Sequence, residues 1–261
     1  MGHVRPPAVA GHFYPSDPDH LLREVMHYLD EAEARVSVPK AIIVPHAGYV
    51  YSGAVAATAY ACIKARAGDI SRVVLLGPAH HTYVRGVALS SADTFTTPLG
   101  PIRVDPEAIR AIQMLPQVIV MDEAHRLEHS LEVQLPFLQV ILSQFKLVPL
   151  VVGDCRPEEV RQVLEVLWGK EENLTVVSSD LSHYHDYETA KSLDAATSEA
   201  IKQLRVEAIH PEQACGCMPV RGLLDFARHH GLKVTTLETK NSGDTAGPRD
   251  QVVGYGAYAL H

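Results

Sequence analysis

Residues 41–49 have the sequence AIIVPHAGY. It opens with a short, continuous apolar run, which is typical of a strand buried on both faces of a sheet. A polar turn follows, and the small residues of 53–65 predict a helix after it. The same pattern of an apolar run and a polar turn recurs at 72–81 (RVVLLGPAHH) and at 174–183 (LTVVSSDLSH). The chain therefore repeats a strand-and-turn unit at three separate places.

Helices are expected between these strands. Residues 17–36 predict the first one, because Asp17 can cap it, Pro18 suits its first turn, and apolar residues recur at spacings of three and four. Further helices are expected at 106–115, 130–145, 157–168 and 188–204, with another opening at Pro219, and further strands at 146–152, 232–237 and 252–259, with a hairpin-like pair at 86–90 and 94–97.

Alternating strands and helices indicate βαβ units. We therefore predict an α/β protein with a central, largely parallel sheet flanked by helices. No linker or internal repeat interrupts the pattern, so residues 1–261 are expected to form a single domain.

Composition and charge exclude several classes of function. Hydrophobic residues make up 46% of the chain and charged residues 21%, which is ordinary globular usage. The 23 Lys and Arg against 31 Asp and Glu give a formal net charge of -8, and no basic run is interleaved with aromatic residues. Nucleic-acid binding needs clustered positive charge, so we do not expect it.

The chain lacks the marks of export and of membrane insertion. Residues 1–18 contain three prolines and no apolar stretch, unlike a signal peptide, and no window has the roughly 18 apolar residues of a membrane span. Four cysteines are too few for a disulfide framework in a chain of this length. A cytoplasmic location with free thiols is the expectation.

Three of the predicted strands end in a loop that carries histidine. His46 follows the first, His80 the second, and His183 lies just beyond Asp180 after the third. The carboxyl ends of parallel strands lie along one edge of a sheet, where ligands bind in the crevice. Topology can therefore bring these residues to one site, although polar strand-end loops contain some histidine for no functional reason.

Several neighbouring residues allow two interpretations. Adjacent side chains on an extended segment diverge, so only one of His80 and His81 is expected to face the crevice. Cys215 precedes a predicted helix N-terminus, which would lower its pKa and favour the metal-ligating thiolate, but Cys215 and Cys217 could equally be small buried residues at a tight turn.

Other motifs argue against common enzyme classes. His129 and Glu132 would share a helix face, but the segment does not match the H-E-x-x-H of zinc proteases, and a capping and packing role is slightly favoured. The loop at 241–247 (NSGDTAG) is not a phosphate-binding P-loop, and the chain contains no G-x-S-x-G elbow of a serine hydrolase.

Taken in order, the motifs resemble those of a known family. They are residues 10–14 (AGHFY), 45–49 (PHAGY), 77–81 (GPAHH), 128–136 (EHSLEVQLP) and 178–183 (SSDLSH), together with the loops at Cys215-Gly and at 242–244 (SGD). This set resembles the Memo family, in particular its prokaryotic branch called AmmeMemoRadiSam system protein B, from about Pro6 to His261. The branch name suggests association with AMMECR-like and radical SAM proteins.

The resemblance implies a fold similar to class III extradiol dioxygenases of the LigB type, which use non-haem iron. It also implies that His46, His80 and Cys215 hold one metal ion and that His183 is the acid/base group, with Asp180 as its orienting partner. Phe13 and Tyr51 match aromatic positions that line the Memo pocket and would contact substrate. These functional residues are all expected in the strand-end crevice.

Cys215 stands where the dioxygenases have a carboxylate. Thiolate favours softer metals, so copper or zinc could replace iron, which remains the first expectation. Three functions are then open. The first is a metal-dependent oxidoreductase acting on a small molecule in the strand-end crevice. The second is a binding or scaffold protein that keeps the pocket without the chemistry, and the third is a zinc-dependent hydrolase.

Overall fold

The computed structural model describes residues 2–34, 36, 38–169 and 171–261. A mixed sheet of nine strands forms its centre, in the order β10-β12-β2-β9-β3-β8-β4-β7, with β11 paired to β12. These strands are β2 (Ala41–Val44), β3 (Arg72–Pro78), β4 (Val87–Leu89), β7 (Val118–Val120), β8 (Lys146–Val152), β9 (Asn173–Ser178), β10 (His183–His185), β11 (Val234–Asn241) and β12 (Val252–Leu260).

The middle of this sheet is parallel. β2, β9, β3 and β8 pair in parallel, in the registers Val44 to Ser178 and Leu76 to Val177 among others. Antiparallel pairs flank this block, β12 with β2 on one side and β4 with β8 on the other. The carboxyl ends of β2, β9 and β3 therefore lie side by side at one edge of the sheet, as the strand-end motifs require.

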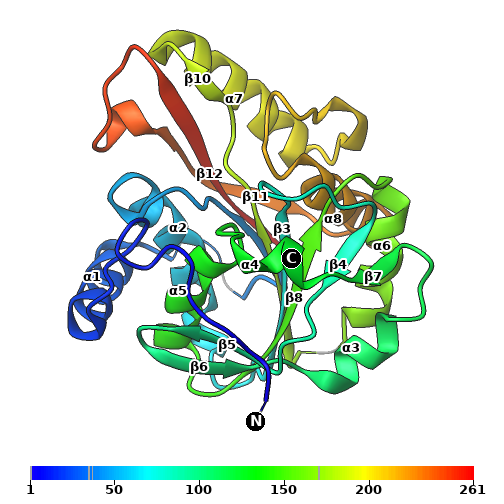
Figure 1. Ribbon diagram of the computed structural model, residues 1–261. Coiled ribbons are helices and arrows are strands. Elements are labelled where there is room, and N and C mark those ends of the chain that lie inside the picture. Colours follow the sequence, from blue (N-terminus) through cyan, green and yellow to red (C-terminus); the bar gives the residue numbers. More distant parts are fainter. Residues whose placement is uncertain (1, 35, 37, 170) are drawn as a thin grey trace.

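Helices cover both faces of the sheet, as Figure 1 shows, with α1, α2 and α5 on one side and α3, α6 and α8 on the other. The helices are α1 (Pro18–Glu31), α2 (Tyr49–Ile63), α3 (Pro106–Ile112), α4 (Asp122–Arg126), α5 (Leu135–Ile141), α6 (Pro157–Leu167), α7 (Tyr187–Lys202) and α8 (Cys217–His230). Side chains alternate across each strand, so Ile42 and Val44 enter one core while Ala41 and Ile43 enter the other. The predicted α/β architecture is confirmed, with a sheet that is mixed and mostly parallel.

The first helix is shorter than predicted. It begins as expected, since the Asp17 side chain accepts the main-chain N–H of His20 and Pro18 occupies the first turn. It ends at Glu31, however, and Ala32 is extended, while Arg35 of the predicted range lies outside the described residues. Ala32 and Val36 still pack against the core. The spacing of four residues between Ala32 and Val36 continues the helical pattern in the sequence, although the backbone is already extended at Ala32.

Two other predictions are confirmed only in part, since the elements exist but differ in their pairing or extent. Residues 86–90 and 94–97 do not pair with each other, because β4 joins the main sheet. β5 (Thr94–Thr97) instead forms a small sheet with β1 (Val4–Arg5) and β6 (Gly100–Arg103). Within the predicted helix at 130–145, only the 3-10 turn at Glu132–Gln134 and α5 are helical. Pro136 lies in the first turn of α5. Residues 128–131 are left outside any helix.

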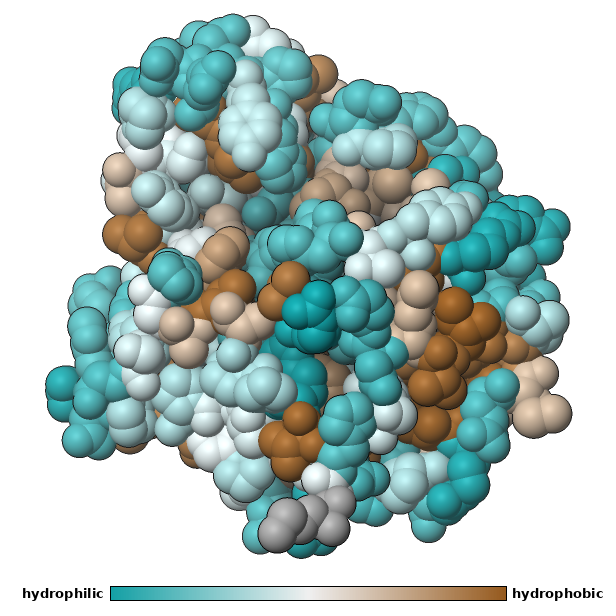
Figure 2. Space-filling model, viewed as in Figure 1, coloured by the Kyte–Doolittle hydropathy of each residue, from teal (hydrophilic) through white to brown (hydrophobic). Residues whose placement is uncertain are grey.

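The visible face is mostly hydrophilic, with an apolar cluster on the side where β7 lies (Figure 2). β7 is the last strand of the sheet path, and its Ile119 and Val120 are exposed. No helix in the part of the chain that the structure describes is both long and apolar enough to cross a bilayer.

Candidate metal centre

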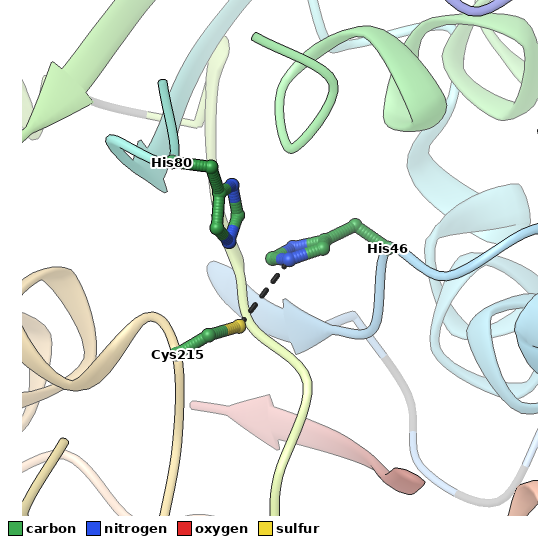
Figure 3. Close-up of side chains that lie close together, drawn as sticks. All are labelled: His46, His80 and Cys215. Atoms are coloured by element: carbon green, nitrogen blue, oxygen red, sulfur yellow. Dashed lines mark hydrogen bonds between the residues drawn. The ribbon is translucent and has the colours of Figure 1, made fainter. Parts of the chain in front are cut away.

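His46, His80 and Cys215 meet at the carboxyl edge of the sheet. His46 lies just beyond β2, His80 just beyond β3, and Cys215 just before α8. Each offers one ligand atom, and these three atoms all lie within 4.8 Å of one another (Figure 3). The distance from His46 Nε2 to Cys215 Sγ is 3.3 Å. The parallel block brings together residues that are as far apart in sequence as 46 and 215.

His80 is oriented by a carboxylate. Its main-chain N–H donates to Glu128 Oε2 at 2.7 Å, and its Nδ1 lies 2.9 Å from Glu128 Oε1. Ser130 N also donates to Oε1. Burial opposes ionisation of Glu128, yet these hydrogen bonds hold its pKa far below the usual range. The ionised Glu128 therefore accepts a hydrogen bond from the Nδ1–H of His80, which leaves Nε2 free to bind a metal.

His46 is fully enclosed, with only 1% of its surface exposed. Its main-chain N–H donates to Asp180 Oδ1 at 2.7 Å, and its Nδ1 lies 2.8 Å from the Ser178 hydroxyl oxygen. Burial, together with the neighbouring imidazoles of His129 and His80, lowers the pKa of His46 well below its ordinary value. The ring is therefore neutral at physiological pH, as a metal ligand must be.

Cys215 does not have the lowered pKa expected of a thiol at a helix N-terminus. Burial raises its pKa, and the nearby Asp180 carboxylate raises it further. α8 starts only at Cys217, with Gly216 as its N-cap, so Cys215 lies outside the first turn. The hydrogen bond from Asp180 N to Cys215 Sγ, at 3.3 Å, does not offset the burial. Burial likewise raises the pKa of Asp180 to about 7.

Gly216 allows Cys215 to approach the sheet. A Cβ atom at this position would lie 2.6 Å from the Cβ of Ser179 and 2.7 Å from the main-chain oxygen of Ser178. Any side chain there would push the loop away from the end of β9. The glycine after Cys215 is thus required for the sulfur to reach His46.

A third imidazole, His129, lies against the rings of His46 and His80. Its ring stacks on His80 with centroids 4.5 Å apart, and Phe13 packs against it at 4.7 Å. Burial lowers the pKa of His129 to about 4. With His80 and Glu128 it forms a second group whose ligand atoms lie within 4.8 Å. Sequence reasoning missed this placement because it took the segment for a helix, whereas His129 lies in the non-helical part before Glu132.

His183 is the first residue of β10. Burial lowers its pKa, a hydrogen bond with the Leu181 carbonyl opposes this, and the charge of His80 contributes to the lowering. The Asp180 carboxylate instead accepts hydrogen bonds from the main-chain N–H groups of His46 and Ala47. The roles of His183 as acid/base and of Asp180 as its partner stay predictions.

The loop that carries His183 is fixed from two sides. Leu181 and Ser182 exchange main-chain hydrogen bonds with Gly254 of β12, both at 2.8 Å, and Ser182 N donates to Asp194 Oδ1 of α7. A Cβ atom on Gly254 would lie 2.0 Å from Asp194 Oδ2, so only glycine leaves room for this carboxylate. The position of His183 thus depends on residues far away in sequence.

The remaining predicted residues lie around the pocket or away from it. Phe13 lies against His129, and Tyr51 is partly exposed in the first turn of α2. His81 is exposed and is in neither group, so His80 is the member of the pair that joins His46. Cys217 is buried in the core on the α8 face of the sheet. The substrate-contact roles of Phe13 and Tyr51 stay predictions.

The donor set fits a metal ion. Two imidazole nitrogens and one sulfur suit zinc, copper and iron better than magnesium or calcium. Bonds of about 2.0 Å to nitrogen and about 2.3 Å to sulfur would place the two atoms roughly 3.5 Å apart in a tetrahedral site. The observed 3.3 Å between His46 Nε2 and Cys215 Sγ is close to that value.

Comparison with known proteins agrees with the motifs. A family model described as Memo-like protein matches residues 5–259. The chain belongs to the Memo-like protein family. Among its relatives, a MEMO1 family protein of Aquifex aeolicus is 38% identical over 264 residues, and one of Sulfolobus acidocaldarius is 36% identical over 278 residues. Each alignment covers 97% of both chains. The Memo-like match therefore extends over nearly the whole chain.

A solved structure shares the fold of this Memo-like chain. The uncharacterized protein JW3007 from Escherichia coli K12 superposes with a TM-score of 0.53, covering 84% of this chain and 98% of that one, at 14% identity. At this identity the likeness concerns the fold alone.

Proposed function

We propose that this Memo-like protein is a metal-dependent oxidoreductase related to extradiol dioxygenases of the LigB type and acting on a small aromatic molecule. His46, His80 and Cys215 would hold one metal ion, with iron favoured and copper or zinc as alternatives. The observation that carries the proposal is the convergence of these three ligand atoms within 4.8 Å of one another. A redox-active metal bound there would supply electron-transfer chemistry and open positions for substrate.

The chain's own residues would prepare that site. Glu128 holds the Nδ1 proton of His80, so the free nitrogen of that ring points to the metal position. Burial keeps His46 neutral, and the Cys215 thiol would lose its proton on binding the metal. The protein thus offers two neutral donors and one that becomes anionic.

His183 would move the substrate proton. A neutral imidazole carries a proton on one ring nitrogen, which leaves the other nitrogen as a base. Burial lowers its pKa, so the ring is neutral near pH 7 and ready to accept a proton from a phenolic hydroxyl. Phe13, which packs against His129, and Tyr51, which is exposed in the first turn of α2, would provide apolar contact for an aromatic ring.

Metal content is the first test. The wild-type protein and the Cys215→Ser variant would be purified without oxygen and their metals measured by elemental analysis. Cys217→Ser is the matched control, because its sulfur is buried in the core outside the ligand group. We expect about one metal ion per chain in the wild type and the control, and a large loss in Cys215→Ser. Equal metal content in all three proteins would show that Cys215 is not a ligand.

Oxygen consumption with a panel of catechols is the second test. We expect uptake by the iron-loaded wild type and strong loss in His183→Ala, with metal content unchanged. Stoichiometric zinc with no oxygen uptake would overturn the oxidoreductase and favour hydrolysis, while absence of any metal would overturn the metal-dependent function altogether.

A further inference from the structure

The hydroxyl of Ser178, the last residue of β9, contacts three buried groups. Its hydroxyl oxygen lies 2.7 Å from the Ser130 carbonyl oxygen, 2.8 Å from Gln134 Nε2 and 2.8 Å from His46 Nδ1. Ser178, Ser130 and Gln134 are completely buried, and His46 is 1% exposed. Donors and acceptors must therefore be matched within the protein, because unpaired polar groups in such a position are costly.

The orientation of the Gln134 amide is fixed by a main-chain carbonyl. One end of the amide lies 2.8 Å from the Pro45 oxygen, which can only accept a hydrogen bond, so this end is the Nε2 amine. The other end, Oε1, accepts the hydroxyl of Tyr60 at 2.9 Å. Gln134 therefore approaches Ser178 as a donor.

The Ser178 hydroxyl has only one proton to give. The Ser130 carbonyl can only accept, so this proton points to it. Gln134 Nε2 donates to the Ser178 oxygen, and the remaining neighbour, His46 Nδ1, must then donate as well. Nδ1 of His46 thus carries the ring proton, and Nε2 has the lone pair that faces Cys215 Sγ.

We propose that Ser178, held in place by Gln134 and the Ser130 carbonyl, is a positioning residue that fixes His46 as its Nδ1–H tautomer and thereby makes Nε2 the metal ligand. This inference rests on the metal-binding function proposed above. The opposite tautomer would turn a protonated Nε2 towards the metal position. It would also turn the Ser178 proton towards Nδ1 and leave the buried Ser130 carbonyl without this hydrogen bond.

The two histidine ligands are therefore held by different chemistry. His80 donates to the ionised Glu128, whereas His46 donates to a neutral hydroxyl. A carboxylate partner raises the basicity of an imidazole ligand more than a hydroxyl does. His80 therefore has an ionic partner, and His46 is the ligand whose orientation depends on a neutral network.

The tautomer is measured without any metal. Long-range ¹H–¹⁵N correlation spectra of the full, ¹⁵N-histidine-labelled chain distinguish a protonated from an unprotonated ring nitrogen, and the His46 signals are assigned by their loss in His46→Gln. We expect His46 to be protonated at Nδ1 in the wild type. A wild-type His46 ring protonated at Nε2 overturns the proposal, and this result does not depend on whether Ser178→Ala folds.

The consequence for the ligand is measured with Co(II), whose visible bands report coordination by sulfur and nitrogen. In Ser178→Ala we expect the Nδ1–H preference to weaken and Co(II) affinity to fall by about tenfold to a hundredfold, as for other partners of metal-bound histidines. Ser198→Ala is the matched control. It removes a buried hydroxyl that pairs with Tyr258 OH in the contact between α7 and β12, and both readouts should stay unchanged.

The two proposals fail in distinguishable ways. Wild-type protein that shows the Nδ1–H tautomer but binds no Co(II) contradicts the metal-binding function. Folded Ser178→Ala that binds Co(II) as tightly as the wild type contradicts the positioning role alone. Equal losses in Ser178→Ala and Ser198→Ala would also overturn it, because the effect would then follow from removing any buried hydroxyl.

Discussion

Replacing Glu132 by Gln should destabilise the protein strongly without touching the metal ligands. The Glu132 side chain is buried and accepts hydrogen bonds from Ala8 N at 2.7 Å, Val9 N at 3.0 Å and the Tyr14 hydroxyl at 2.6 Å. It also forms a buried ion pair with Arg5. The substitution keeps the shape but turns one acceptor into an amine that faces donors and leaves the Arg5 charge without its partner.

The magnitude follows from these contacts. Breaking a buried ion pair by removing one partner costs about 3–5 kcal/mol. Arg5 keeps its hydrogen bonds to the carbonyls of His125 and Glu128, so we expect the low end, about 3 kcal/mol. At about 2–4 °C per kcal/mol for a chain of this size, the midpoint of thermal unfolding should fall by roughly 6–12 °C.

Urea unfolding and calorimetry of the wild type and Glu132→Gln measure this loss. Glu165→Gln is the matched control, because Glu165 pairs with Arg161 on the surface of α6 and its side chain is 40% exposed, where an ion pair contributes less than about 1 kcal/mol. Arg5→Met combined with Glu132→Gln should be more stable than Glu132→Gln alone, since no charge is left unpaired. A loss in Glu132→Gln no larger than in Glu165→Gln would refute the reasoning.

Three further predictions concern the metal centre. His80→Ala should lower Co(II) affinity roughly a hundredfold or more, while the exposed His81→Ala should leave it unchanged; a loss only in His81→Ala would reverse the assignment. Cys215→Ser should lose a comparable share of metal affinity, with an unchanged midpoint of thermal unfolding, whereas Cys217→Ser should keep the metal. The opposite pattern would show that Cys217, and not Cys215, is the ligand. Burial raises the pKa of Cys215, so the thiol must release its proton when it binds a metal, and affinity should rise with pH, by about tenfold per unit between pH 7.5 and 8.5. Titrations at a series of pH values should show this slope in the wild type and lose it in Cys215→Ser.

The parts of the fold that the sequence predicts well are the buried strands. β2, β3 and β8 are continuous apolar runs, because both of their faces are covered, and their ends are clear in the sequence. Short strands at the margins, such as β7 and β6, have only three or four residues and were missed. A strand of three or four residues is too short to show a hydrophobic period. Pairing with a neighbouring strand, and not the local sequence pattern, defines such a strand.

The candidate site was predicted as far as topology determines it. The parallel strands imply that His46 and His80 meet, and the structure places them in one group with Cys215. The raised pKa of Cys215 could not be predicted, since it follows from burial rather than from the nearby helix. His129 and Ser178 were missed for a similar reason. The segment of His129 was treated as a helix, and Ser178 was assigned to the end of a strand. Neither sequence pattern shows which residue a side chain will contact.

The segment that begins at Glu128 links the candidate metal site to the stability of the whole chain. Glu128 turns to His80, His129 enters the pocket, Glu132 binds the N-terminal segment and Gln134 contacts Ser178. A regular helix could not direct residues at these positions to such different neighbours, because residues four apart share a face. Here the chain passes through a non-helical stretch and a 3-10 turn before α5, so each side chain leaves in its own direction. Substitutions in this segment and at Ser178, which it contacts, should therefore have different effects. Loss of Glu132 should change unfolding without changing the His46 tautomer, and loss of Ser178, which the segment supports, should change the tautomer and metal affinity most.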